Sequence, residues 1–237
     1  MRTIKLYYLW LFIFVAFGFG IDSPSQSREE RTVLGDFDEI SVSSGVDLVV
    51  RQGTPTEIIV EAQPNIMERV KTELKGSRLN VYIDGNVFSW FKSGSVKVFV
   101  TTAQIRKLSA SGGADLKSIG EIKGDKVEVS SSGGSDVKVS IKGTNVILRC
   151  SGGGDLTAEG EAEYLDASAS GGADLMARQL MLKRVKASAS GGANVEVYAT
   201  EEIDASASGG GDVDYYGPAK VKRVSESGGG DVTGHGN

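Results

Sequence analysis

The pattern of hydrophobic and polar positions repeats along residues 106–237. Small or aliphatic side chains stand three residues before, and one residue before, each of a series of Ser-Gly-Gly steps. The first column holds Leu108, Val129, Leu148, Ala167, Ala187, Ala205 and Val224. The second holds Ala110, Ser131, Cys150, Ala169, Ala189, Ala207 and Glu226. A mostly serine column lies between them, and this alternation is typical of a β-strand that buries one face.

The steps belong to a hexapeptide, Ser-Gly-Gly-x-Asp/Asn-apolar. Its copies recur at a nearly constant step and start at Ser111, Ser132, Ser151, Ser170, Ser190, Ser208 and Ser227. Paired glycines disfavour a helix, because each costs about 1 kcal/mol relative to alanine. We therefore predict an all-β fold, a single-stranded right-handed parallel β-helix (solenoid) with coils of about 19 residues and glycine corners. A left-handed, hexapeptide-type helix with a slightly shorter coil is the alternative.

Residues 33–105 lack the full motif but have strand-like segments, and the sequence SGVDL at 44–48 is a shortened copy of it. Residues 64–74 place Ile66, Met67, Val70 and Leu74 on one face of a short expected helix. Solenoids need a cap, because an open end exposes unpaired strand edges. We predict one β-helix domain over 33–237, with the N-terminal cap and first coils in 33–105 and the seven repeats in 106–237.

Residues 1–20 have the pattern of a signal peptide. Arg2 and Lys5 precede an apolar run over residues 6–17, with small residues at Gly18 and Gly20 where cleavage is expected. The run is short for a membrane span. A retained leader, the alternative, would be the chain's one contact with the membrane. Export to the periplasm, the outer membrane surface or the medium follows, and residues 21–32 are expected to be a polar linker.

Charge and cysteine content narrow the classes of partner. The formal net charge is -5, and without the leader's two basic residues 24 basic residues face 31 acidic ones. An acidic chain without a basic cluster is a poor candidate for nucleic-acid binding. The one cysteine, Cys150, excludes an intrachain disulfide and stands in a column of small residues, so we expect it to be buried.

The chain resembles a known family. An exported leader, an opening F-x-x-I-x-V-x-x-G-V-D-L-x-V over residues 37–50, and the serial S-G-G-x-D-[LV] steps are similar to the auto-transporter adhesin head domain called the GIN domain. The likeness covers residues 33–237. It implies a right-handed parallel β-helix in the cell envelope, and it brings no catalytic residues.

The candidate site is the column at the fifth position of the motif. It contains Asp115, Asp136, Asp155, Asp174, Asn194, Asp212 and Asp231. Stacked coils would align these side chains at about 5 Å, where carboxylates repel by roughly 1 kcal/mol in water. Bound Ca²⁺ would relieve that repulsion. The alternative is ordinary turn chemistry, in which aspartate beside glycine bonds to nearby backbone N–H groups. No other cofactor is expected.

Two further features bear on function. Gly234-His235-Gly236 matches one short motif of polygalacturonases, but the companion motifs are absent, and His235 is the single histidine, which disfavours a Ser-His-Asp triad. Phe88, Trp90 and Phe91 cluster in a segment expected to be either a hydrophobic plug or a sugar-binding tip.

We therefore expect a non-enzymatic, adhesin-like exported protein that binds a glycan or another envelope component. The serine columns, which would stack as hydroxyl ladders, are one candidate surface. The alternatives are a structural scaffold that self-associates end to end as a homo-oligomer and, third, a carbohydrate-active enzyme. The scaffold hypothesis rests on Glu226, which stands in an otherwise small inward column with no obvious cap after it.

Overall fold

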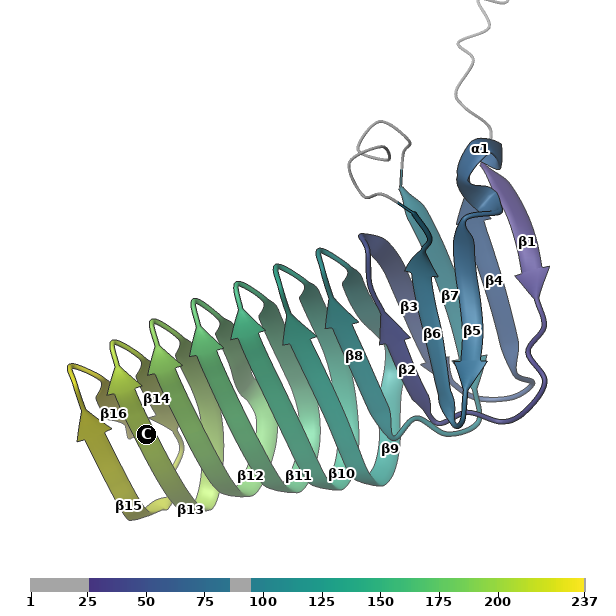
Figure 1. Cartoon of the computed structure of the whole chain (residues 1–237). Helices are drawn as coiled ribbons and strands as arrows, with labels where there is room; N and C mark the ends of the chain where they lie inside the picture. Colours follow the sequence, from purple (N-terminus) through teal and green to yellow (C-terminus); the bar gives the residue numbers. More distant parts are fainter. Residues whose placement is uncertain (1–25, 86–94, 237) are drawn as a thin grey trace, which may run out of the picture.

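The protein is an almost entirely β solenoid, seen in a computed structural model that describes residues 26–85 and 95–236 (Figure 1). The N-terminal elements are β1 (Ser27–Arg31), β2 (Glu39–Val42), β3 (Val46–Gln52), β4 (Glu57–Ala62), α1 (Pro64–Met67), β5 (Val70–Lys75), β6 (Arg78–Ile83) and β7 (Val96–Thr102). The solenoid elements are β8 (Lys107–Ser111), β9 (Asp115–Ser132), β10 (Asp136–Gly152), β11 (Asp155–Gly171), β12 (Asp174–Gly191), β13 (Asn194–Gly209), β14 (Asp212–Tyr216), β15 (Lys220–Ser227) and β16 (Asp231–His235). No helix among the described residues is long and apolar enough to span a membrane.

Successive coils pair in parallel and in register. Strands β9 to β13 each run round nearly a whole coil, and every repeat lies on the one before it. In Figure 1 the chain rises on the near side, turns over at the glycine corner, descends on the far side and advances toward the C-terminus. This path is right-handed, as predicted. The predicted coil length and the stacking of the repeats are also confirmed.

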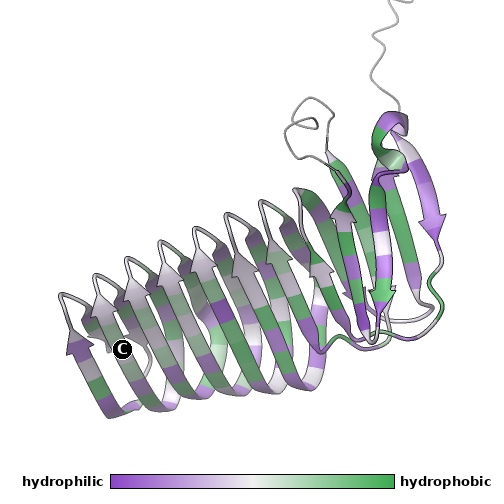
Figure 2. Ribbon diagram, viewed as in Figure 1, coloured by the Kyte–Doolittle hydropathy of each residue, from purple (hydrophilic) through white to green (hydrophobic). Residues whose placement is uncertain are grey.

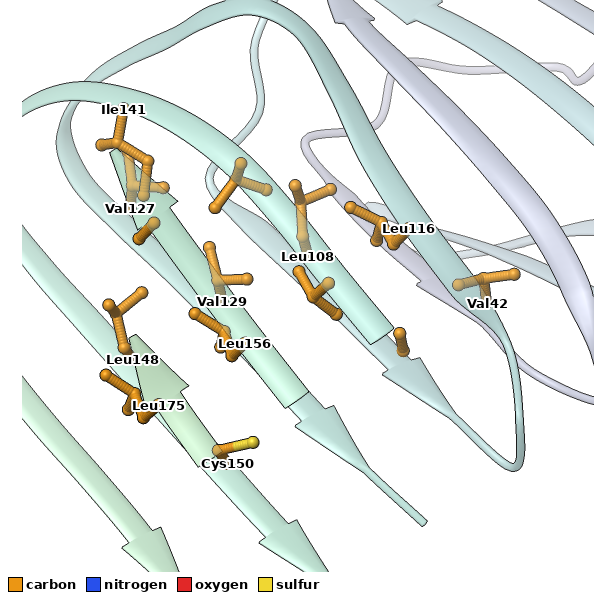
Figure 3. Close-up of a cluster of buried hydrophobic side chains, with 14 of the residues drawn as sticks. Val42, Leu108, Leu116, Val127, Val129, Ile141, Leu148, Cys150, Leu156 and Leu175 are labelled. Atoms are coloured by element: carbon orange, nitrogen blue, oxygen red, sulfur yellow. The ribbon is translucent and has the colours of Figure 1, made fainter. Parts of the chain in front are cut away.

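The inward columns form one continuous core. Leu108, Val129 and Leu148 stack above one another and are fully buried, and Cys150 lies in the adjacent column, 2 % exposed (Figure 3). Hydrophobic segments recur at equivalent places on successive coils (Figure 2). Burying a side chain the size of leucine contributes about 1.5–3 kcal/mol, so the repeated columns supply the main stabilisation of the solenoid.

The first glycine of each repeat makes the corner. These seven glycines all have φ between 60° and 80°, the left-handed region that other residues rarely occupy. The variable position after the two glycines points into the core, and it is occupied by Ala114, Ser135, Gly154, Ala173, Ala193, Gly211 and Gly230, all buried. The corner is therefore tight on both sides, which explains why only small residues appear in it.

The N-terminal cap does not follow the order of the sequence. β6 and β7 form a coil that stacks in parallel on β2 and β3, and the solenoid continues from the other side of β2 and β3 through β8 and β9. β5 then pairs antiparallel with β6, and β4 and β1 add antiparallel strands beyond β7. These antiparallel strands close the first end of the stack (Figure 1).

Two local expectations were wrong. The helix expected over residues 64–74 ends at Met67, and residues 70–75 form β5, because pairing with β6 satisfies their backbone and buries Val70. Residues 27–31, expected within a polar linker, form β1 because the free edge of β4 offers them a partner. The predicted leader and the Phe88, Trp90 and Phe91 cluster lie outside the described residues.

The last coil departs from the alternation. Val224 stacks beneath Ala205 as the pattern predicts, yet it is 42 % exposed. Glu226 stacks beneath Ala207 but is exposed, and its carboxylate accepts a hydrogen bond from the backbone N–H of Val232 at 2.9 Å. The inward position of Glu226 is thus a surface position, because no coil among the described residues covers it.

Candidate functional site

The aspartate column is assembled as the repeats predict. Strand register pairs Asp115 with Asp136, and continues without a slip through Asp155, Asp174, Asn194, Asp212 and Asp231. The column also includes Asp47, which pairs with Asp115 and was missed as a site residue. Its signal was present in the sequence, since Asp47 lies in the shortened repeat at 44–48.

Stacking changes the electrostatics of the column. Partial burial, followed by the charges of Asp136 and Asp174, raises the pKa of Asp155 above its ordinary value. The pKa of Asp115 is raised in the same way, by burial and by the charges of Asp136 and Asp47. Like charges at one strand spacing favour the neutral acid, so the column holds unfavourable charge at neutral pH.

The carboxylates lie in a row and do not enclose a cation. Among residues 26–85 and 95–236, no group of three or more acidic, histidine or cysteine side chains is arranged to hold a metal ion. Ca²⁺ takes six to eight oxygen ligands. A row one side chain wide offers two neighbouring carboxylates at a time, and the rest of a coordination shell would have to be water. Cation binding at the column stays a prediction.

The serine columns lie on the outward face of the strands that lead into the corners. Ser130 donates a hydrogen bond to the Ser109 hydroxyl at 2.9 Å, and the Ser188 and Ser206 hydroxyls are 2.8 Å apart. Arg149 interrupts the column and makes a two-pronged contact with Asp166 on the next coil, with N–O distances of 3.1 and 3.0 Å. The hydroxyls therefore bond along the stack and form a row of regular spacing.

Neither reactive side chain belongs to a catalytic group. Cys150 is buried, its Sγ donates to the Gly154 carbonyl at 2.9 Å, and burial raises its pKa to about 11. The thiolate nucleophile is therefore scarce at neutral pH. His235 contacts Asp214 at 2.6 Å and stacks on Tyr216, so the Gly-His-Gly segment is explained by packing at the last coil.

Open hollows occur where the cap meets the solenoid. Two of them, of about 590 and 620 Å³, share Gln52, Ala103 and Lys123. The Gln52 side chain stitches this junction, donating to the carbonyls of both other residues and accepting from the Lys123 N–H at 2.7 Å. Nearby, Arg106 pairs with Asp38 at 2.9 Å and lowers the pKa of that carboxyl. These polar groups mainly satisfy one another, so the hollows are junction surfaces.

Solved structures show the same fold. A putative adhesin from Bacteroides fragilis NCTC 9343 superposes with a TM-score of 0.79 at 23% identity, over 90% of this chain and 99% of that one. A putative adhesin from Parabacteroides merdae ATCC 43184 gives 0.69 at 20% identity, over 90% and 97%. A putative lipid binding protein from Parabacteroides distasonis ATCC 8503 gives 0.69 at 16% identity, over 90% and 98%.

Among curated proteins, none is significantly similar in sequence. The family model described as "Putative auto-transporter adhesin, head GIN domain" matches residues 36–219. The match spans the inner cap strands and the solenoid as far as the start of the last coil, which is the part of the chain that carries the repeats. The chain therefore belongs to the GIN-domain family of auto-transporter adhesin heads.

Proposed function

We propose that the protein is an exported, non-enzymatic, adhesin-like component of the cell envelope that binds a glycan or another surface component along its solenoid. Family membership and the leader-like segment at 1–20 support this reading. The single observation that carries it is the regular outward row of serine hydroxyls, which repeats at one strand spacing over successive coils. Polymers with regularly spaced hydroxyl groups can contact many such positions at once.

The chemistry of the face fits a polar ligand of many weak contacts. Each hydroxyl is both a donor and an acceptor. The net stabilisation from a single hydrogen bond is only about 0.5–1.5 kcal/mol, so affinity must come from many coils acting together. The row is also rigid, because every strand that bears it is paired on both sides from β9 to β13. Rigidity reduces the entropy lost on binding.

Binding of the purified chain to a glycan array and to isolated envelope polysaccharide tests the proposal. A variant carrying Ser168→Ala, Ser188→Ala and Ser206→Ala removes three neighbouring hydroxyls without changing the core. We expect weaker binding by about tenfold or more. The matched control is Glu159→Ala, Glu196→Ala and Glu201→Ala, outside the serine columns. Equal binding by both triple variants would remove the serine face from the proposal.

The enzymatic alternative has its own readout. Pectin-like and other polysaccharides are incubated with the protein, and release of reducing ends or unsaturated products is measured. We expect binding without product. Turnover that survives purification and is lost in a His235→Ala or Asp214→Ala variant would instead establish a carbohydrate-active enzyme.

A further inference from the structure

The two ends of the solenoid differ. At the first end, antiparallel strands β1, β4 and β5 lie outside the parallel stack. At the other end, β15 pairs only with β13 and β16 pairs only with β14, and no strand of residues 26–85 or 95–236 lies on their outer edges. Unpaired strand edges are templates for association with another chain.

The inward side chains of this last coil are uncovered. Val221 is 50 % exposed and Val224 is 42 % exposed, whereas Ile203 and Ala205, their counterparts one coil earlier, are fully buried. Everywhere else in the stack, such side chains are covered by the next coil. The end face is therefore an apolar surface whose shape and hydrogen-bonding edge match another coil of the same kind.

Glu226 stands in the middle of this apolar surface. Its column is otherwise alanine, serine or cysteine, and its carboxylate reaches from β15 to the backbone N–H of Val232 on β16. Any coil stacked on the end face would take this carboxylate out of water, which costs several kcal/mol per ion when no partner charge is present. Inward-pointing charges are one of the devices that protect sheet edges from association.

We propose that this end face is a docking surface for a second copy of the chain and that the charge of Glu226 holds it closed. A second copy is the occupant because every coil here stacks on a near-copy of itself. The capped end cannot receive the end face, so two copies meet end face to end face about a two-fold axis. Such an isologous contact closes at a dimer and gives no filament.

The test compares the wild type with Glu226→Ala and Glu226→Gln over a concentration series, using size-exclusion chromatography with light scattering. The wild type is expected to stay monomeric. Both variants are expected to dimerise, with a dissociation constant at least about tenfold lower than that of the wild type. Glu201→Ala, which removes one exposed carboxylate away from the end face, is expected to leave the monomer unchanged.

A second substitution checks the location of the contact. Adding Val224→Lys to Glu226→Ala places a new charge on the end face and is expected to restore the monomer. Circular dichroism confirms that each variant is folded. Folded Glu226→Ala and Glu226→Gln proteins that both remain monomeric would overturn the proposal. So would a wild-type dimer, growth beyond dimers, or a dimer that survives the Val224→Lys substitution.

Discussion

Asn194 donates a hydrogen bond from its Nδ2 to Oδ1 of Asp174 on the coil before it, at 2.8 Å. It is the one amide in a column of eight side chains, and at this step a favourable contact replaces the repulsion between two carboxylates. An amide is therefore accommodated at this corner without loss of register. The native chain thus provides its own precedent for neutralising the column.

Asp155→Asn is expected to stabilise the protein at neutral pH. Burial and the charges of Asp136 and Asp174 raise the pKa of Asp155, so folding favours its neutral form. That contribution is fully present below the ordinary carboxyl pKa and is lost as pH rises through the raised value. Because the side chain is exposed and screened, we expect a gain of about 0.5 kcal/mol at pH 7.

Thermal melting of both proteins from acid to neutral pH measures the effect. The difference between variant and wild type should be positive at neutral pH and should disappear in acid, where the native carboxyl is also neutral. Asp125→Asn, at an exposed aspartate outside the column, is the control and should show no such pH-dependent gain. A stability difference independent of pH would contradict the electrostatic explanation.

Calcium should act on the column only as a salt. Neighbouring carboxylates in a single row supply few ligands, so we expect CaCl₂ and NaCl at equal ionic strength to shift the melting temperature alike through screening. Melting curves over a calcium titration measure this. A saturable shift specific to Ca²⁺, abolished by Asp155→Asn plus Asp174→Asn, would show instead that the column binds the cation.

The corner glycine should be sensitive where its neighbour is not. Gly171 has φ of 80°, and a Cβ there would lie 3.0 Å from the Gly152 carbonyl oxygen of the preceding coil. Gly171→Ala is expected to lower the free energy of unfolding by about 1–3 kcal/mol. Gly172→Ala is the control, because its Cβ would lie 3.7 Å from the same oxygen. Equal costs in urea unfolding would contradict the corner geometry.

Cys150 should respond to size more than to chemistry. It stacks between Ser131 and Ala169, so Cys150→Ala keeps the character of the column, while Cys150→Leu forces a larger side chain into it. We expect the leucine variant to lose about 1–3 kcal/mol and the alanine variant less. In the wild type, thiol reagents should label this single cysteine only upon unfolding. Rapid labelling of the folded protein would contradict its burial.

The repeats alone determined the solenoid. A motif that recurs at a nearly constant step with period-two alternation has one economical packing, in which each coil covers the next, so the parallel register and the aspartate column follow from local pattern. The column's missing member, Asp47, could have been found by treating the shortened repeat as a full rung.

Only the tertiary structure decided the two ends. At the first end, residues 70–75 pair with β6 although their spacing suits a helix, because hydrogen bonding to an available edge outweighs weak local preference. At the other end, Glu226 occupies an inward position yet stays in water, because burial depends on whether another coil lies beyond it. A repeat encodes what lies between neighbours, and the ends are the places where a neighbour is missing.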